Sequence, residues 1–578
     1  MHNQELIRQF HELAELTKIE DGSAQSFRVR AYEKAVRAIE AATEDLTELS
    51  MADLQKLEGV GKSTAEKIRE YATDGVVGKL AKLRKAYPRE FVELGRIPGV
   101  GPKTLILLRD ELGVHNLEDL KAALAAEKVR DLPGLGAKTE EKITKSIDRL
   151  GLHGKDRRTP IHIAMPIARE FVDALLAMEN VKQAEYCGSL RRFSETIGDV
   201  DIVVAASDRT GIMERFAQLP AVSEVLAQGD TKSSILTSTG LQVDLRIVKP
   251  SEWGAATLYF TGSKTHNIEL RQRALKRGWT LNEYALSEIE SEAVVASKTE
   301  KAIYSALDLA YVNPRLREGI GEIAAADENS LPNLVEMADL EGDLHVHSDW
   351  SGDGRSTLEA MVAAQAARGF SYMALTDHGE DLAMNGLSRE RMLDQRRVLM
   401  ALQDDYPDMR LLHGCELNID AEGNVDYDAD FLAGFGYGVA SVHSYFDLDI
   451  VTQTTRVVRA MQNPAVNAIG HLTGRKLGKR PGIEVDLEAV FEAAELTGTA
   501  IEINGHLQRL DATSEALRLA RGSKVKFVID TDAHHVNELE NSYYGCLNAQ
   551  RGWVDKAQVV NTWSKKRFLE WVESKRAG

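Results

Sequence analysis

Residues 188–206 read GSLRRFSETIGDVDIVVAA, and this stretch decides how the middle of the chain folds. The run that begins at Asp199 is rich in β-branched residues, which predicts a strand. Side chains two apart on a strand point to the same face, so the carboxylates of Asp199 and Asp201 share a face. Ahead of them a Gly-Ser turn leads to Arg191 and Arg192, which can meet polyphosphate charge. The stretch therefore predicts a carboxylate pair on a strand beside an anion-binding turn.

A second strand is expected at residues 241–248, LQVDLRIV, and it supplies a third carboxylate. Its alternation turns the aliphatic residues toward the core and turns Gln242, Asp244 and Arg246 to the opposite face. Three carboxylates on neighbouring strands are what two Mg²⁺ ions need to hold a hydroxyl and a nucleoside triphosphate in line. An isolated Asp-x-Asp pair also occurs at solvated strand edges, so the turn and the third carboxylate carry this interpretation.

Residues 1–150 are helical by pattern, because apolar residues recur at spacings of three and four. One motif occurs there three times, as LEGVGKSTAEKI, IPGVGPKTLILL and LPGLGAKTEEKI. The glycine pairs of the three copies are Gly59 and Gly61, Gly99 and Gly101, and Gly134 and Gly136. Two glycines allow a tight turn after which amides face a phosphate oxygen. A single copy fits a plain helix corner, but three copies predict sequence-independent binding to a nucleic-acid backbone.

The last 240 or so residues carry imidazoles and carboxylates that follow short apolar runs. The predicted cluster consists of His345, His347, Asp353, His378, Glu416, His443, His471, Asp532 and His534. In a parallel barrel the carboxyl ends of the strands converge, so these side chains are expected to gather. Such a set, without cysteine, suits more than one ion of Zn²⁺, Mn²⁺ or Fe²⁺. His413, His506 and His535 lack this spacing and are interpreted as ordinary core or surface histidines.

Composition indicates a soluble, multidomain chain whose two parts differ in charge. The 578 residues exceed one ordinary domain, and 43% hydrophobic with 28% charged residues is typical of globular proteins. Residues 1–300 hold 43 Lys and Arg against 46 Asp and Glu, whereas residues 301–578 hold 28 against 43. We therefore expect the first part to hold most of any bound nucleic acid.

Cysteine usage and hydropathy exclude several other classes of protein. Cys187, Cys415 and Cys546 are far apart, which excludes a disulfide framework and a thiolate zinc site and predicts buried cysteines. No apolar run is long enough to cross a bilayer, and the first residues do not resemble a signal peptide. We expect a cytoplasmic protein.

The segment GSLRRFSETIGDVD resembles the catalytic signature of the family X DNA polymerases, the nucleotidyltransferases that include DNA polymerase beta. A second block, LYFTGSKTHNIELRQRALKRGWTLNEYAL from Leu258, resembles the thumb of that family. The resemblance implies metal-binding roles for Asp199, Asp201 and Asp244, with Mg²⁺ or Mn²⁺ as the ion. It implies nucleotide-binding roles for Gly188, Ser189, Arg192, Gly198, Tyr259, Phe260, Gly262 and Asn267, and a DNA-template contact for Arg271. Lys264 and His266 depart from the family's pattern.

The first 85 residues resemble the small lyase domain of the same family, through FRVRAYEKA from Phe27 and the first glycine motif. The resemblance places Lys67 where the family has its Schiff-base lysine. A lysine forms an imine with an abasic sugar if its surroundings lower its pKa. A basic phosphate-contacting position of the family is Ser63 here, so a solvated helix lysine remains an equal alternative.

The carboxyl-terminal part resembles the polymerase-and-histidinol-phosphatase (PHP) domain, a distorted (β/α)₇ barrel with a trinuclear metal site. All nine family ligand positions are filled by the nine residues of the predicted cluster. In bacterial family X enzymes this domain is associated with Mn²⁺-dependent 3′→5′ exonuclease and 3′-end trimming. The resemblance also implies that Arg475, in GHLTGR, holds the substrate phosphate.

Together these features predict a multidomain α+β and α/β protein that polymerises DNA in short repair gaps and trims 3′ ends. The predicted parts are a lyase-like domain (1–85), helix-hairpin-helix fingers (86–155), a palm (156–250), a thumb (251–322), a linker (323–340) and a PHP barrel (341–578). We expect a monomer that is associated with the nucleoid and uses gapped or primed DNA and deoxynucleoside triphosphates. Two alternatives stay open: a small-molecule phosphatase tethered to DNA, and a non-catalytic scaffold for DNA ends.

Overall fold

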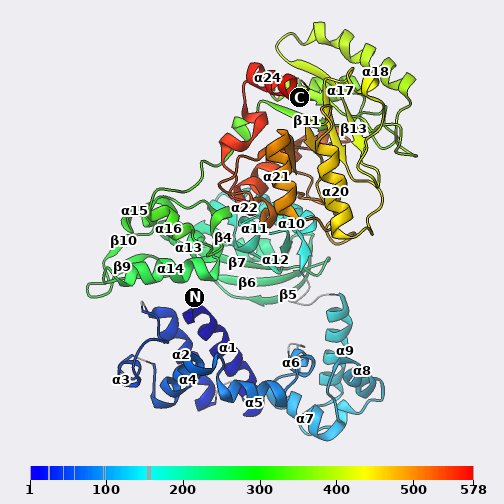
Figure 1. Ribbon diagram of the computed structural model, residues 1–578. Helices are drawn as coiled ribbons and strands as arrows, with labels where there is room; N and C mark the ends of the chain where they lie inside the picture. The colour runs from blue at the N-terminus through cyan, green and yellow to red at the C-terminus, as the bar shows by residue number, and fades with distance from the viewer. Residues whose placement is uncertain are drawn as a thin grey trace. The chain divides into compact units, whose positions relative to one another are not determined.

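The computed structural model describes residues 2–23, 26–42, 44–57, 59–95, 97, 99–152 and 158–576. The chain divides into two compact units (Figure 1). One unit contains residues 1–157, 178–183 and 203–307, and the other contains residues 158–177, 184–202 and 308–578. The chain therefore passes between the two units several times.

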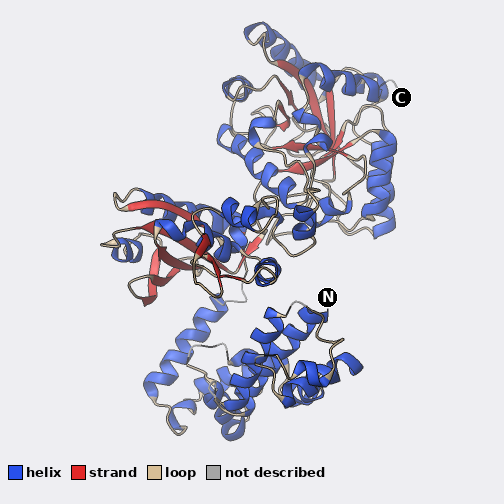
Figure 2. Ribbon diagram, turned by 90° about the vertical axis from the view of Figure 1, so that its left-hand side faces the viewer, coloured by secondary structure: helices blue, strands red, loops and turns tan. Residues whose placement is uncertain are grey.

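The amino-terminal region is helical throughout its described residues, as its spacing of apolar residues predicts (Figure 2). Leu6, Phe10 and Leu13 lie on one face of the first helix and are fully buried. The second helix begins after Ser26, whose hydroxyl accepts the N–H of Val29. The helices are α1(His2–Glu20), α2(Phe27–Ala41), α3(Met51–Leu54), α4(Lys62–Asp74), α5(Gly78–Ala86), α6(Arg89–Leu94), α7(Pro102–Leu112), α8(Leu117–Ala125), η1(Val129–Asp131) and α9(Ala137–Leu152).

Each copy of the glycine motif forms the turn before a helix, α4, α7 or α9. The first glycine of each pair has a positive φ, 90° at Gly59, 101° at Gly99 and 81° at Gly134. Gly61 and Gly101 cap α4 and α7 in an extended conformation. A left-handed residue followed by an extended one turns the chain sharply, which glycine allows without steric cost. The tight turns predicted from the three motifs are confirmed.

Five strands form a sheet in the order β2-β4-β7-β6-β5. They are β2(Val181–Tyr186), β4(Asp199–Ala206), β5(Val222–Gln228), β6(Lys232–Thr237) and β7(Gln242–Val248). In β7, Val243, Leu245 and Ile247 are buried and alternate with partly exposed polar residues, as predicted. A two-stranded ladder pairs β1(Thr159–Pro160) with β3(Thr196–Ile197). Neighbouring helices are α10(Ile161–Leu176), α11(Gly188–Arg191) and α12(Ile212–Ala217).

The segment after β7 combines helices with a small antiparallel sheet of order β10-β9-β8. Its elements are η2(Pro250–Glu252), α13(Trp253–Thr261), α14(Lys264–Leu275), β8(Trp279–Leu281), β9(Leu286–Glu288), β10(Val294–Ala296) and α15(Glu300–Ala306). Gly254 lies in α13 where a Cβ would come within 2.2 Å of the Thr299 backbone, so only glycine allows this approach.

Residues 314–339 form η3(Pro314–Leu316), α16(Glu322–Asp327) and η4(Met337–Asp339), with an isolated bridge between Leu334 and Asp555. The predicted linker therefore contains short helices, and the residue boundaries predicted for the domains stay predictions. No helix in the described part of the chain is long and apolar enough to cross a membrane.

Seven parallel strands follow one another in chain order and form a nearly closed barrel. They are β11(Gly342–Val346), β12(Tyr372–Leu375), β13(Arg410–Asn418), β14(Tyr437–Ser441), β15(Ala468–Ile469), β16(Ala500–Asn504) and β17(Lys526–Asp530). Val346 bridges to Ala533, and the His347 N–H donates to the Ala533 carbonyl at 2.9 Å, which joins the last strand to the first. The (β/α)₇ barrel that the resemblance to the PHP domain implies is confirmed.

Helices lie on the outside of these strands (Figure 2). They are α17(Leu358–Ala367), α18(Arg389–Leu402), η5(Gln403–Asp405), α19(Ala429–Leu432), α20(Ile450–Met461), α21(Leu487–Thr497), α22(Ser514–Leu519), η6(Val536–Glu540), α23(Asn541–Arg551), η7(Lys556–Gln558), η8(Val560–Thr562) and α24(Lys565–Arg576). Phe568 of α24 stacks on Tyr372, the first residue of β12, with ring centroids 4.2 Å apart. The amino ends of the strands are thereby covered, which leaves the carboxyl ends for function.

Candidate active sites

The first candidate site begins at the start of β4. Asp199 is exposed, Val200 is buried and Asp201 is partly exposed, so the two carboxylates share the face that their spacing predicts. Gly188 has a positive φ, and a Cβ there would lie 3.0 Å from Oδ2 of Asp201. The Cys187 N–H donates to the Asp201 carbonyl at 2.7 Å. Glycine therefore allows the turn of the GSLRR segment to pass directly beside a carboxylate of the pair.

The third carboxylate, Asp244, lies in β7, which the strand order places next to β4. Its side chain is partly exposed, and Oδ1 accepts a hydrogen bond from Nε2 of Gln242 at 2.8 Å. Ser234 of β6 lies opposite Asp244 in the ladder. Gln242 holds one carboxylate oxygen in place and leaves the other for a cation.

The GSLRR segment forms the short helix α11 and the turn that follows it. Ser189 and Gly188 are partly exposed at its start, and Gly198 is partly exposed between β3 and β4. Arg192 forms an ion pair from Nε to Glu318 at 2.9 Å, and its carbonyl accepts a hydrogen bond from Nη1 of Arg551 at 2.8 Å. The turn predicted to bind triphosphate is thus held by two side chains that lie far away in the sequence.

A small pocket brings together Tyr259 and Asn267, predicted to bind the nucleotide, and Arg271, predicted to contact the template strand. It is lined by Ala255, Leu258, Tyr259, Asn267, Arg271, Leu281 and Asn282. Nδ2 of Asn267 donates to the Tyr259 carbonyl at 2.8 Å, and Nε of Arg271 donates to the Asn267 carbonyl at 3.3 Å. Phe260 lies edge-on to Tyr259 at 5.2 Å between ring centroids, and Gly262 ends α13 with a positive φ. Sequence reasoning did not find Leu281 and Asn282, which come from β8 and the turn after it.

A larger groove of about 650 Å³ lies at the first glycine turn. It is lined by Phe27, Arg30, Ala31, Lys34, Gly59, Val60, Gly61, Lys62, Ser63 and Thr64. Three of these are basic, which suits a nucleic-acid phosphate. Lys67 is partly exposed beside the groove, with Nζ 2.9 Å from Oγ of Ser63 and 5.7 Å from the centre of the Tyr32 ring.

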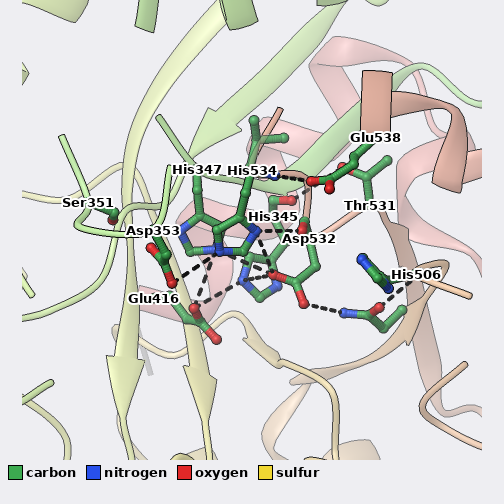
Figure 3. A network of polar contacts seen from close by, with 12 residues as sticks. His345, His347, Ser351, Asp353, Glu416, His506, Thr531, Asp532, His534 and Glu538 are labelled. Carbon is green, nitrogen blue, oxygen red and sulfur yellow. Dashed lines mark hydrogen bonds and ion pairs between the residues drawn. The ribbon is translucent and has the colours of Figure 1, made fainter. Parts of the chain in front are cut away.

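The second candidate site gathers the nine predicted imidazoles and carboxylates at the carboxyl ends of the barrel strands. Figure 3 shows His345, His347, Asp353, Glu416, Asp532 and His534 of this set. Seven of the nine come together in groups of three whose ligand atoms lie within 4.8 Å of one another. The groups are His345 with His347 and Asp532, His347 with His378 and His534, and His378 with Glu416 and His443. Three overlapping groups favour a site for several ions.

Glu416 of β13 lies at the centre of this cluster. Its Oε2 is 2.9 Å from Nδ1 of His378 and 3.4 Å from Nε2 of His347. Its Oε1 is 2.9 Å from Nε2 of His471 and 3.2 Å from Nε2 of His443. One carboxylate with imidazoles on both oxygens is suited to bridge two cations.

Asp353 and His471, the two residues outside those groups of three, also belong to the cluster. Oδ2 of Asp353 lies 3.3 Å from Nε2 of His378 and 3.4 Å from Nε2 of His534. His471 contacts the central Glu416 and is only 1% exposed. All nine predicted residues therefore lie together at one end of the barrel.

Polar atoms in this cluster lack the partners that buried groups require. The buried side-chain atoms that have no hydrogen-bond partner among the described residues include Nε2 of His345, Nε2 of His347, Nε2 of His471 and both oxygens of Glu416. Buried polar atoms are almost always satisfied, so this many orphaned atoms in one place indicate missing ligands. Nitrogen and oxygen atoms aimed at a common volume fit divalent metal ions.

Electrostatics at this centre act differently on different imidazoles. Burial disfavours charge on His345 and His378, but neighbouring carboxylates, Glu502 and Glu416 foremost, raise the pKa of both. Burial lowers the pKa of His347 to about 3, and the neighbouring His534 and His378 add to the shift. Burial opposes charge on Glu416 as well, but the imidazoles around it, His443 foremost, hold its pKa well below the usual range. Neutral imidazole and ionised carboxylate are the forms that ligate metals.

Two supporting residues escaped the sequence reasoning. Oε1 of Glu502 lies 2.6 Å from Nδ1 of His345, and Glu502 is fully buried in β16. Oδ1 of Asn418 lies 2.7 Å from Nδ1 of His443. Each holds a ring so that Nε2 faces the cluster, the usual arrangement around metal-binding histidines. The signal for Glu502 was a lone acidic residue within the apolar strand AIEIN.

Arg475 does not point its guanidinium to open space. Nη1 and Nη2 form a forked ion pair with Glu195 at 2.9 and 2.6 Å, and Nε donates to the Arg509 carbonyl at 2.8 Å. Nδ1 of His413 accepts a hydrogen bond from Nε of Arg396, and Nε2 of His413 contacts Oε1 of Gln395. The ring therefore lies away from the nine-residue cluster. The three cysteines are buried, as predicted, and none of them forms a disulfide.

Comparisons with known proteins match both parts of the chain. Four family models match: a helix-hairpin-helix domain (1–77), a SAM-like helix-hairpin-helix tandem (91–149), the DNA polymerase beta thumb (256–318) and the PHP domain (343–530). A Bacillus subtilis protein named DNA polymerase/3′-5′ exonuclease PolX is 36% identical over 569 residues, which cover 98% of this chain and 98% of its own.

Two further relatives match one part each. DNA polymerase lambda of Rattus norvegicus is 26% identical over 52% of this chain and 54% of its own length. A probable phosphatase of Acetivibrio thermocellus is 30% identical over 40% of this chain and 95% of its own length. The long Bacillus subtilis match joins both parts in one relative.

Proposed function

The chain belongs to the family X DNA polymerases that carry a PHP domain, and on that premise we propose that it fills short gaps in DNA and trims 3′ ends. It is a DNA polymerase with a metal-dependent 3′→5′ exonuclease. The observation that carries the second activity is the convergence of nine imidazoles and carboxylates with orphaned atoms at the carboxyl ends of the barrel strands.

In the polymerase half, we assign the metal ligands to Asp199, Asp201 and Asp244. Their partly or fully exposed carboxylates on neighbouring strands suit Mg²⁺ or Mn²⁺, which would neutralise the triphosphate and acidify the primer 3′-hydroxyl when bound. Ser189 and Arg192 bind the triphosphate from the turn before β4. Because phosphoryl transfer needs mainly positioning and charge stabilisation, these contacts supply most of the catalysis.

The pocket at α13 and α14 selects the nucleotide. Tyr259, Phe260 and Gly262 back the incoming sugar, and Asn267 contacts the nascent base pair. Arg271 contacts the template strand. The hydrogen bonds from Asn267 to the Tyr259 carbonyl and from Arg271 to the Asn267 carbonyl support this assignment, since they fix the side chains of Asn267 and Arg271 on the backbone that lines the pocket.

In the PHP half, the nine clustered residues hold up to three divalent ions, for which Mn²⁺, Zn²⁺ and Fe²⁺ are the candidates. Bound there, the ions would supply a hydroxide and clamp the scissile phosphate. Glu416 lies between the imidazoles, and Glu502 and Asn418 hold two rings in the orientation that ligation needs. The 3′-terminal phosphodiester is the substrate.

Three helix-hairpin-helix turns bind the DNA backbone through Gly59, Gly61, Gly99, Gly101, Gly134 and Gly136. Such contacts position DNA without reading its sequence. The basic groove at the first turn suits a DNA 5′-phosphate, and Lys67 beside it is a candidate for abasic-site lyase chemistry. The protein acts as a monomer in the nucleoid, where its substrates are found.

The test uses gapped DNA with a labelled primer, in Mg²⁺ or Mn²⁺, with and without nucleotides. Asp244→Ala abolishes extension and spares degradation, whereas His471→Ala abolishes degradation and spares extension. A DNA-tethered phosphatase predicts no extension by any variant. A non-catalytic scaffold predicts neither activity in the unchanged protein. Either pattern would end the proposal.

The probable phosphatases that match the PHP half favour one addition, hydrolysis of 3′-phosphate ends. A primer that carries a 3′-phosphate tests this directly, since its removal restores extension. His471→Ala would keep such a primer blocked.

A further inference from the structure

Arg509 lies beside the metal-binding cluster on the loop after β16. Its Nε forms an ion pair with Oδ2 of Asp532 at 3.0 Å. The other oxygen of Asp532, Oδ1, lies 3.5 Å from Nε2 of His347. Asp532 therefore joins the guanidinium of Arg509 directly to the cluster.

This guanidinium is short of partners. The Arg509 side chain is 15% exposed, and its Nη1 is buried without a hydrogen-bond partner among the described residues. A desolvated guanidinium N–H with no acceptor is costly, and an anion that enters the site relieves the cost. The fork of Arg509 matches the spacing of two oxygens on a phosphoryl group.

A second loop, residues 474–480, brings two more cations to the same place. The Leu477 N–H donates to the Gln508 carbonyl at 2.7 Å, which ties this loop to that of Arg509. Arg480 lies over the Phe446 ring at 4.0 Å and donates from Nη2 to the Gly474 carbonyl at 2.6 Å. These contacts hold Arg480 in position without neutralising it.

Lys476, on the same loop, lies near other positive charges. Burial lowers its pKa, and the nearby Arg509 and Arg480 lower it further, while Asp532 acts in the opposite direction. Cations held close together without enough acidic partners favour a polyanionic ligand.

Arg475 organises this region and is itself engaged. Its forked ion pair with Glu195 uses both terminal nitrogens, and its Nε holds the carbonyl of Arg509 at 2.8 Å. Arg475 thus fixes the loop that carries Arg509. The guanidinium with a free nitrogen beside the cluster is that of Arg509.

We infer that Arg509 binds the scissile phosphate of a DNA 3′ end, and that Lys476 and Arg480 bind the phosphate on its 5′ side. This rests on the proposed exonuclease function of the PHP half. As the oxygen of water adds to phosphorus and the bond to the 3′-oxygen breaks, negative charge grows on the phosphoryl oxygens, and the Arg509 fork stabilises it. The 3′-oxygen leaves with a proton that the attacking water gives up. Lys476 and Arg480 act as point charges on a neighbouring phosphodiester, so they contribute to binding of a polynucleotide.

The test compares two probes in the full-length protein loaded with Mn²⁺. One is octathymidylate, which has several phosphodiesters, and the other is the p-nitrophenyl ester of thymidine 5′-monophosphate, which has one. Arg509→Lys and Arg509→Met should each lower kcat about 100-fold on both probes, as loss of a single anion-stabilising donor does in other active sites. Lys476→Ala should raise the KM for octathymidylate, and this increase should be about ten times the increase in the KM for the ester.

Three measurements separate this role from a structural one. Metal content should be unchanged in the Arg509 variants, and gap-filling extension should be intact. Arg397→Lys, an exposed arginine on α18, is the matched control and should leave both probes unaffected. For Lys476→Ala, the slope of log(kcat/KM) for octathymidylate against log[NaCl] should become shallower by about 0.7, the value for one phosphate contact on a single strand.

Wild-type kcat in both Arg509 variants would overturn the inference, and so would a kcat loss that follows loss of bound metal. An equal effect of Lys476→Ala on the two probes would overturn the polynucleotide subsite, because Lys476 would then act only at the phosphate that both probes share. If His471→Ala leaves the exonuclease intact, the proposed function fails. If only the Arg509 and Lys476 results disagree, the failure is confined to the subsite.

Discussion

Replacing Glu502 with glutamine is expected to weaken metal binding at the PHP centre without unfolding the barrel. The two carboxylate oxygens accept from different donors: Oε1 from Nδ1 of His345 at 2.6 Å, and Oε2 from the His471 backbone N–H. Nδ2 of Asn504 also donates to Oε2, at 3.2 Å. A carboxylate satisfies all three donors because it accepts on both oxygens.

Glutamine has one accepting oxygen, so its NH₂ group must face a donor whichever way the amide is turned. If the NH₂ faces His345, the ring loses the acceptor that keeps its proton on Nδ1 and its Nε2 free for metal. An opposed buried donor costs about 1–3 kcal/mol, which equals a factor of about 5 to 150 in affinity. The range agrees with the loss of about 10- to 100-fold that follows removal of a carboxylate partner from a metal-binding histidine.

The assay is titration of the metal-free protein with Mn²⁺, followed by calorimetry and by recovery of 3′→5′ degradation. Glu502→Gln should shift both curves to higher Mn²⁺ by one to two orders of magnitude and leave primer extension unchanged. Glu492→Gln, an exposed glutamate on α21, is the control. A Mn²⁺ affinity within a factor of two of the unchanged protein would refute the reasoning.

Three other outcomes are expected. Chelation should abolish degradation and lower the thermal midpoint of the barrel, because the orphaned buried atoms lose their cations, and added Mn²⁺ should restore both. A thermal midpoint that calorimetry finds unchanged after chelation would contradict this. Glu318→Gln should lower the thermal midpoint at pH 7, and this difference should shrink as the pH falls below the unfolded pKa of about 4.5: burial raises the pKa of Glu318, yet Arg551 and Arg192 lower it overall, so its stabilisation is present above the unfolded value and is lost as the pH falls through the folded one. Gly438→Ala should cost about 1–3 kcal/mol in denaturant unfolding, because its Cβ would lie 2.2 Å from the Ala465 carbonyl; a cost below 0.5 kcal/mol would contradict the packing.

Local sequence patterns predicted those parts of the protein whose structure depends on residues that are close together in the sequence. Alternation in β7 fixes which residues of that strand face the core, and Gly59 marks a turn because only a residue without Cβ adopts its φ of 90° at no cost. The nine clustered residues were recognisable because most of them follow a short apolar run, and parallel strands end at a common edge.

Contacts between distant segments could not be predicted in this way. Arg475 was expected at the substrate phosphate because of its position in GHLTGR, and nothing near it in the sequence signals Glu195, 280 residues away. Glu502 lies in an apolar strand and looks like an exception until its neighbour His345 is known. Arg509 belongs to no motif in the sequence. Its proposed role depends on its contact with Asp532 and on one nitrogen that lacks a partner, and neither is visible in the sequence.

The two sites differ in burial, and this difference explains why one chain can hold both. Asp199 is exposed and Asp244 partly exposed, so ions there exchange with solvent and arrive with the charge of the nucleotide. His345 and Glu416 are fully buried among imidazoles. Loss of an ion from there, with nothing to replace it, would leave buried polar atoms without a partner. Oxygen ligands near solvent select hard ions held weakly, whereas buried nitrogen ligands select transition metals held tightly. In the proposed function, the polymerase half would take up its ions with each nucleotide and the PHP half would keep its own, so the two activities would not compete for one metal.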